Sequence, residues 1–171
     1  MGKGQNFERE MAKKLSLWWS DGEDDSHFWR SSMSGGRATV RAKSGKSTSN
    51  SCGDLMAMTA LGQTLLDITA FELKKGYNSY SIQDLFDKPN MANGFGAFIE
   101  QAYRDSSLAG CRDWTVVHKR DRREPIFVTS MDIPSFRIWV PSLQSAISVV
   151  PEHWFLTPGT KEIVKEYAIN A

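Results

Sequence analysis

The sequence predicts an α/β domain with a central mixed β-sheet, and three observations support this class. Apolar side chains recur at helical spacing over residues 5–19 and again over residues 95–108. Short apolar runs of strand length stand between and after these segments, so helices and strands alternate along the chain. A chain of 171 residues with 40% hydrophobic content is the size of one domain with a real core. We therefore expect a single domain over residues 1–171.

The N-terminal region is expected to supply a helix and then a strand. Apolar residues from Phe7 to Trp18 fall on one helical face, and an acidic loop over residues 21–25 follows. Residues 27–33 (HFWRSSM) resemble a short strand. The Ser- and Gly-rich stretch 34–52 comes next and holds too few apolar side chains for a core.

Residues 53–74 predict an antiparallel hairpin with its turn near Gly62. This pairing sets Asp54 opposite Glu72, with their Cβ atoms roughly 5 Å apart. Glu72 and Lys74 are two positions apart on one strand, so their side chains point to the same face. Two carboxylates and an ammonium thus meet at one end of the hairpin, which predicts a metal site with a lysine beside it. The alternative is that Glu-x-Lys is a solvated strand edge.

The second half of the chain predicts further helices and strands on either side of the charged turn RDRREP. A short helix is expected over residues 81–86, stopped before Pro89, and a longer one over 95–108 with Gly110 after its end. The strand-like segments and the C-terminal elements complete the expectation: strands over 114–119, 126–130 and 136–140, a short helix or strand over 143–150, and a terminal helix from Gly159 onward.

Taken in order, several short motifs resemble the PD-(D/E)xK nuclease superfamily and, within it, the Holliday-junction-resolvase-like branch. The matching motifs are Gly4-Gln-Asn-Phe-Glu8, Trp29-Arg30-Ser-Ser-Met-Ser34, Gly53-Asp54, Glu72-Leu73-Lys74, Glu100-Gln101-Ala102 and Val117-His118-Lys119-Arg120. The resemblance covers roughly residues 4–130, with residues 131–171 as a C-terminal extension of unknown role. Gly53 departs from the family pattern because a proline usually stands there, and the segment between Ser34 and Gly53 is a long insertion.

The resemblance implies a restriction-endonuclease-like fold, with a central mixed sheet flanked by helices, and a role for each matching residue. Asp54, Glu72 and the Leu73 carbonyl are expected to hold Mg²⁺, for which Mn²⁺ is expected to substitute. Lys74 is expected to orient the hydrolytic water. Glu8 is expected to be an additional or water-mediated metal ligand, and Glu10 competes for this role. Gln101 is expected to contact the metal-site water or a phosphate. The alternative for Gln101 is an ordinary solvated helix position.

The implied function is a Mg²⁺-dependent DNA endonuclease that hydrolyses a phosphodiester by in-line attack of water and leaves a 5′-phosphate. The resolvase-like pattern favours branched DNA such as Holliday junctions, and two symmetric cuts then imply a homodimer. The small size fits a phage or mobile-element enzyme. Two alternatives stay open: a restriction- or repair-type endonuclease on linear duplex, and a non-catalytic DNA-binding module of the same fold.

Positive charge gathers in two segments that are candidate DNA contacts, because Lys and Arg neutralise backbone phosphates. The alternative for the first of them is a solvated loop. The first segment follows the predicted Arg-bearing strand, and the second is the charged turn between two strands. The candidate DNA-binding residues are Arg30, Ser34, Arg37, Arg41, Lys43 and Lys46 in the first, and Lys119, Arg120, Arg122 and Arg123 in the second.

Composition and motifs exclude several other classes. A net charge of +1 gives no global argument for nucleic acid, and two Cys with three scattered His do not make a zinc site. Ser44-Gly-Lys-Ser-Thr48 fails as a P-loop because Val40 stands where the first glycine belongs, so no nucleotide cofactor is expected. No signal peptide or membrane-length apolar run is present, so we expect no membrane contact and a cytoplasmic location in a bacterium or phage-infected host.

Overall fold

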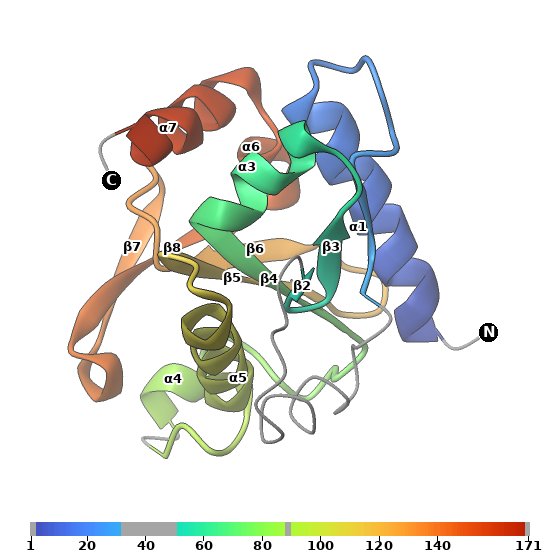
Figure 1. Ribbon diagram of the computed structural model, residues 1–171. Helices are drawn as coiled ribbons and strands as arrows, with labels where there is room; N and C mark the ends of the chain where they lie inside the picture. The colour runs from blue at the N-terminus through green and yellow to red at the C-terminus, as the bar shows by residue number, and fades with distance from the viewer. Residues whose placement is uncertain (1–2, 32–50, 88–89, 170–171) are drawn as a thin grey trace.

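The computed structural model describes residues 3–31, 51–87 and 90–169. A five-stranded sheet forms its centre, and it consists of β4 (Thr69–Lys75), β5 (Asp113–Lys119), β6 (Ile126–Thr129), β7 (Phe136–Val140) and β8 (Ser145–Pro151). The strand order is β4-β5-β6-β8-β7 (Figure 1). β4 and β5 run parallel, whereas the other neighbours are antiparallel. The predicted α/β class with a mixed sheet is therefore confirmed.

A small antiparallel sheet lies beside the β4 edge of the main sheet. It contains β1 (Phe28–Arg30), β2 (Ser51–Cys52) and β3 (Leu55–Ala57) in the order β1-β3-β2. A single parallel bridge between Gly53 and Phe71 joins the turn of β2 and β3 to β4. This bridge brings the short motif at Gly53-Asp54 against the middle of the main sheet's edge strand.

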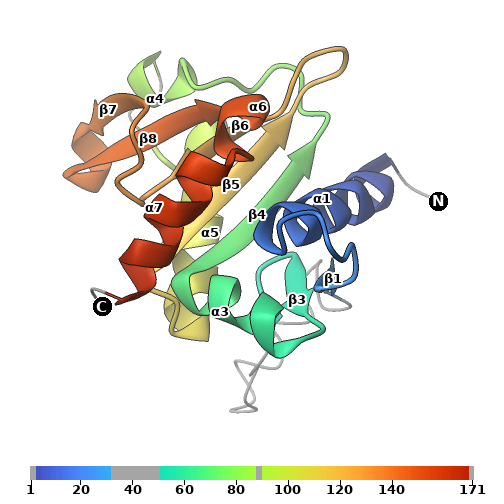
Figure 2. The same cartoon turned by 90° about the horizontal axis from the view of Figure 1, so that it is seen from above.

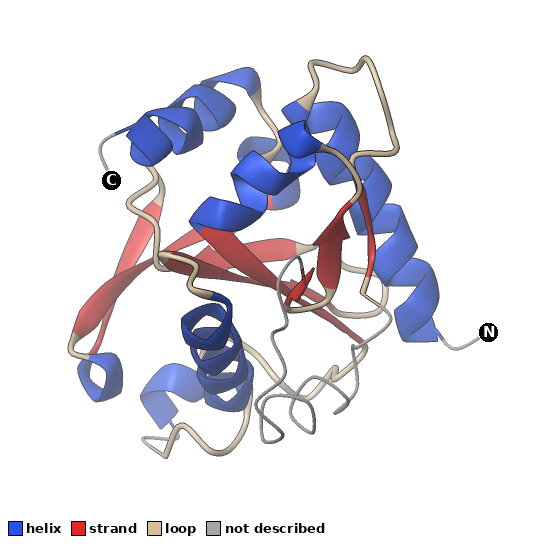
Figure 3. Ribbon diagram, viewed as in Figure 1, coloured by secondary structure: helices blue, strands red, loops and turns tan. Residues whose placement is uncertain are grey.

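Helices cover both faces of the main sheet, which lies between them as the red layer in Figure 3. They are α1 (Lys3–Trp19), α3 (Ala60–Ile68), α4 (Asp84–Asp87), α5 (Phe95–Ala109), α6 (Glu152–Phe155) and α7 (Pro158–Ile169). The view from above shows α1, α6 and α7 on one face and α5 on the other (Figure 2). The predicted helices at the N-terminus, over 81–86, over 95–108 and at the C-terminus are all confirmed, with small shifts at their ends.

The predicted hairpin over residues 53–74 is wrong, because helix α3 occupies its centre. Thr59 caps this helix by accepting a hydrogen bond from the Gly62 N–H to its side chain. Gly62 is required inside the helix, since an added Cβ would lie 2.4 Å from the His27 carbonyl oxygen. β3 and β4 are thus separate strands, and β4 pairs in parallel with β5 instead of antiparallel with a hairpin partner.

Alternation along β4 assigns its side chains to two separate cores. Phe71 and Leu73 are buried on the face covered by α1 and α3. The intervening Glu72 and Lys74 point to the face covered by α5, where the Lys74 ammonium lies 5.4 Å from the Phe98 ring centroid. The predicted common orientation of Glu72 and Lys74 is confirmed by this arrangement.

The segment after residue 130 belongs to the same sheet. β8 pairs with β6 and β7 forms the outer edge, so the open alternative over residues 143–150 resolves as a strand preceded by a 3₁₀ turn at Pro141–Leu143. Phe155 is fully buried and stacks on Phe127 at 4.1 Å, while Trp154 is exposed. Within the described ranges, no helix is long and apolar enough to cross a membrane.

Candidate active site

Asp54 and Glu72 do converge, although through a parallel bridge rather than a hairpin. The Gly53–Phe71 bridge places the following Asp54 beside Glu72. Asp54 is held at both ends: its main-chain N–H donates to the Phe71 carbonyl at 2.8 Å, and its Oδ2 accepts from the Leu73 N–H at 2.8 Å. Asp54 is only 8% exposed, so this carboxylate is fixed at the sheet edge.

Glu72 is the most buried acid of the site, with 1% of its surface exposed. The Lys74 ammonium forms an ion pair with its Oε1. Apart from this ion pair, neither carboxylate oxygen of Glu72 has a hydrogen-bond partner in the part of the chain that the structure describes. Burial, with the nearby Asp54 carboxylate, raises the pKa of Glu72 to about 8, and burial raises the pKa of Asp54 to about 6.

The same two acids stabilise the charged form of Lys74. Burial acts to lower the pKa of Lys74, but the Glu72 and Asp54 carboxylates outweigh it and leave this pKa above its ordinary value. The ammonium also donates a hydrogen bond to Gln101 Oε1 at 3.1 Å. Lys74 is therefore a charged, oriented donor beside two carboxylates.

The donor set fits a hard divalent cation that keeps part of its water shell. Glu72 offers two carboxylate oxygens, one of them paired with the Lys74 ammonium, and the second oxygen of Asp54 remains beside it. The Leu73 N–H points to Asp54, and an extended strand turns the N–H and C=O of one residue to the same side, so the Leu73 carbonyl faces this edge too. No group of three His, Cys, Asp or Glu close enough to ligate one ion occurs among the described residues, so water and substrate oxygens would complete the coordination.

Glu8 and Arg30 meet at the border of this site. The Arg30 Nε donates to Glu8 Oε2 at 2.9 Å, which joins α1 to β1. Glu8 also lies close enough to Asp54 for its charge to raise the pKa of that carboxyl. Glu10 instead forms ion pairs with Lys14 at 3.1 Å and Lys119 at 3.7 Å. The structure thus brings Glu8, rather than its competitor Glu10, toward Asp54.

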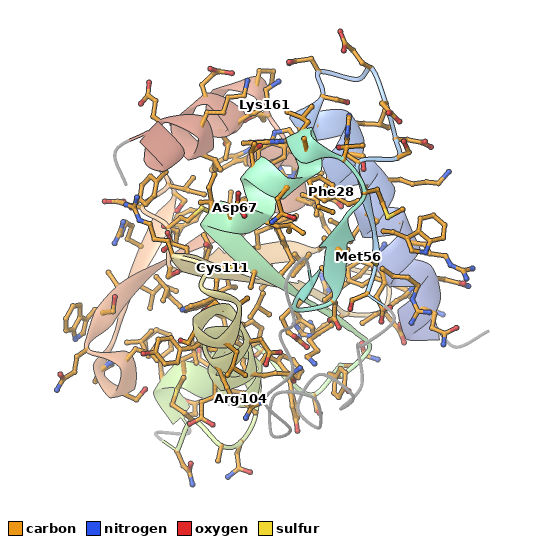
Figure 4. The ribbon with its side chains drawn as sticks, in the orientation of Figure 1. Phe28, Met56, Asp67, Arg104, Cys111 and Lys161 are labelled. Carbon is orange, nitrogen blue, oxygen red and sulfur yellow. The ribbon has the colours of Figure 1, made fainter. Side chains whose placement is uncertain are left out.

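One residue of the site was missed in the sequence. Asp105 accepts a hydrogen bond from the Gln101 side chain, and its charge adds to the rise in pKa that burial causes at Asp54 and Glu72, while the Lys74 ammonium acts on Asp105 in turn. Burial raises the pKa of Asp105. It stands next to Arg104, which Figure 4 labels on α5, and one helical turn after Gln101. The Gln-x-x-x-Asp spacing is the signal that would have found it.

Apart from Arg30, which pairs with Glu8, the candidate DNA-binding residues fall into three groups. Ser34, Arg37, Arg41, Lys43 and Lys46 lie outside the described residues. Lys119 faces α1, where its ammonium lies 5.9 Å from the Phe7 ring centroid, so it does not join the acids on the α5 face. Arg120, Arg122 and Arg123 lie on the turn between β5 and β6, where Arg122 and Arg123 are exposed.

Gly53 has a structural reason to replace the usual proline. Its φ of +71° lies in the left-handed region that proline cannot reach. An added Cβ would also lie 2.2 Å from the Phe71 carbonyl oxygen. Glycine therefore permits the close approach that sets Asp54 against β4.

A buried Asp followed by a Glu-x-Lys strand at the edge of a mixed sheet defines the PD-(D/E)xK class of nucleases. The family model described as "Phage putative PDDEXK endonuclease" matches residues 1–152, and the chain belongs to this family. The match confirms the phage-type PD-(D/E)xK resemblance and does not single out a Holliday-junction branch. No curated protein and no solved structure matches the chain.

Proposed function

We propose that this protein is a Mg²⁺-dependent DNA endonuclease whose active centre is formed by Asp54, Glu72 and Lys74. The observation that carries the proposal is the pair of buried carboxylates, fixed at one sheet edge beside a charged lysine. Burying such a pair is costly unless a cation offsets it. Membership of a phage endonuclease family supports the reaction class.

The proposed mechanism assigns a task to each residue. Asp54, Glu72 and the Leu73 carbonyl would hold Mg²⁺, for which Mn²⁺ would substitute, and Glu8 would reach the ion through water. When bound, the cation supplies positive charge that polarises the scissile phosphate and favours ionisation of water. Lys74 holds the attacking water in line with the phosphorus and offsets developing negative charge. Gln101 keeps the Lys74 ammonium in place through the 3.1 Å hydrogen bond.

The finer proposal concerns the substrate and the assembly. The order of Glu8, Arg30, Gly53-Asp54 and Glu72-x-Lys74 resembles junction resolvases, which supports branched DNA as substrate. Two symmetric cuts in a four-way junction need two centres, so the active form is a homodimer. Such an enzyme works in the cytoplasm of the infected host, where DNA replicates.

The test is a cleavage assay with Mg²⁺ on a four-way junction, a flap, single-stranded DNA and the linear duplex arms of the same junction. The proposal predicts paired cuts in the junction at a rate well above that of its linear arms. Equal cleavage of junction and arms would refute branch specificity and leave a restriction- or repair-type endonuclease. No cleavage of any substrate, together with retained DNA binding, would show a non-catalytic binding module.

A further inference from the structure

A second polar feature lies next to the centre, on the α5 side of the sheet. It is a pocket with a volume of about 390 Å³ between the segment before α4 and the turn after β5. Ser81, His118, Arg120, Arg123 and Glu124 contribute its polar walls, and two isoleucines complete it. We call it the Arg120 pocket.

The Arg120 pocket adjoins Lys74 through its floor. His118 is the direct partner of Lys74 in the parallel register of β4 and β5, so their Cα atoms are about 5 Å apart. Both side chains contact Phe98: the Lys74 ammonium lies 5.4 Å from its ring centroid, and the His118 ring centroid lies 5.6 Å from it. One aromatic ring therefore separates the proposed catalytic lysine from the pocket.

The charges of the pocket favour an anion. Within the described ranges, neither Arg120 nor Arg123 forms an ion pair with a carboxylate. The one acid on the wall, Glu124, is engaged by His153, whose main-chain N–H donates to it at 3.1 Å and whose Nδ1 lies 2.5 Å away. His118 is 2% exposed and donates its Nε2–H to the Gly76 carbonyl at 3.2 Å, which fixes the floor.

We propose that the Arg120 pocket binds one backbone phosphate of the DNA strand being cut, near the phosphate that Lys74 serves. This rests on the proposed function, because the anion is taken to be part of the nuclease substrate. Guanidinium groups bind phosphate oxygens in pairs of parallel hydrogen bonds, and the Ser81 hydroxyl is a further donor that lines the pocket. The pocket thus sets which phosphate enters the centre.

Arg122 provides a matched control, because it lies on the same turn and carries the same charge but does not line the pocket. Arg120→Gln, Arg123→Gln and Arg122→Gln are compared for binding to a fluorescent DNA in Ca²⁺, with circular dichroism to confirm folding. Losing one specific phosphate contact weakens binding by about tenfold in Arg120→Gln and in Arg123→Gln, and lowers the salt slope by about one. The exposed charge of Arg122 gives a loss of about threefold or less.

Single methylphosphonate substitutions, which remove the charge of one phosphate at a time, then locate the contact. At one position near the cut, the neutral linkage should weaken DNA binding by the wild-type protein. The same linkage should cause no further loss of binding in Arg120→Gln. Equal losses of binding for all three arginine variants, or additive losses at every substituted phosphate, would refute phosphate binding in the Arg120 pocket. Cleavage by the wild type would in that case still support the nuclease function. A wild type that never cleaves, yet shows this selective pattern in binding, would refute the nuclease and keep the pocket.

Discussion

The Leu73 N–H donates a hydrogen bond of 2.8 Å to Asp54 Oδ2. This contact ties the carboxylate from the turn between β2 and β3 to the strand that carries Glu72 and Lys74. The three side chains therefore share one frame even though α3 separates their segments in the sequence. Much of the expected behaviour of the protein follows from that frame.

Gly53→Ala tests the close approach of Gly53 to Phe71, which sets Asp54 beside Glu72. The new Cβ would overlap the Phe71 carbonyl oxygen at 2.2 Å and occupy a φ of +71°, so we expect unfolding to become easier by about 3 kcal/mol or more. Gly110→Ala is the matched control, since Gly110 has a φ of +74° but no atom near its added Cβ, and should cost about 1–2 kcal/mol. Urea unfolding of both variants measures the difference. Equal losses would show that the contact with Phe71 has no role.

Glu72→Gln tests the buried acid through the pH dependence of stability. In the native protein the Glu72 carboxyl has a pKa of about 8, against an ordinary value of 4.5. The native state thus binds more protons than the unfolded state between these values, so the unfolding free energy of the metal-free protein should fall as pH rises through this window. The fall should be on the order of 2–4 kcal/mol, and Glu72→Gln should keep only the smaller part that the raised pKa of Asp54, about 6, contributes.

Adding Mg²⁺ should oppose this loss at pH 8, because the cation binds the charged carboxylates of the native state. Thermal unfolding at pH 5, 6, 7 and 8, with and without Mg²⁺, is the measurement. A wild-type curve no steeper than that of Glu72→Gln would contradict the raised pKa of Glu72.

Gln101 and Asp105 are expected to position Lys74. Gln101→Ala removes a hydrogen bond to a charged group, which should lower the cleavage rate by about 10- to 100-fold with little change in DNA affinity. Asp105→Ala should give a smaller loss, because Asp105 reaches Lys74 through the Gln101 amide and acts on Asp54 and Glu72 only through its charge. Glu100→Ala, on the exposed side of α5, is the control. Equal rates for Gln101→Ala and Glu100→Ala would assign Gln101 to ordinary solvation.

The roles of Glu8 and Glu10 can be distinguished by the Mg²⁺ concentration that variants of each residue need for cleavage. Glu8→Gln removes charge beside Asp54 and should raise the Mg²⁺ concentration for half-maximal cleavage by about tenfold. Glu10→Gln should change it less than about twofold, because Glu10 pairs with Lys14 and Lys119 instead. A larger effect from Glu10→Gln would reverse the assignment.

The sequence predicted the class of fold and most of its elements, because the amphipathic helices and apolar strands carry strong periodic patterns. It failed over residues 60–68, where a continuous apolar run does not distinguish a strand from a buried helix. The Thr59 cap was the available sign of a helix. The prediction that Asp54 lies beside Glu72 was still correct. The parallel bridge between Gly53 and Phe71 makes the next two residues neighbours, as the expected antiparallel pairing would have done.

Other parts of the site depend on tertiary structure that a single sequence does not reveal. Asp105 occupies an ordinary polar position on α5, and only the packing of that helix on β4 brings it to the centre. The Arg120 pocket likewise needs the register of β4 and β5, which sets His118 beside Lys74. The positive charge in the sequence indicated the turn between β5 and β6 as a candidate DNA contact. It did not show that Arg120 and Arg123 line the pocket and Arg122 does not.

The central claim is that Asp54 and Lys74 act in Mg²⁺-dependent cleavage. The most direct measurement is the cleavage rate of wild type, Asp54→Ala and Lys74→Ala, with Asp67→Ala and Lys75→Ala as controls. Asp67 lies exposed on α3 (Figure 4), and Lys75 faces Phe7 on the opposite side of β4. We expect losses of about 100-fold or more for the first two variants and rates near wild type for the controls. Unchanged Mg²⁺-dependent cleavage in both Asp54→Ala and Lys74→Ala would contradict this role of the two residues.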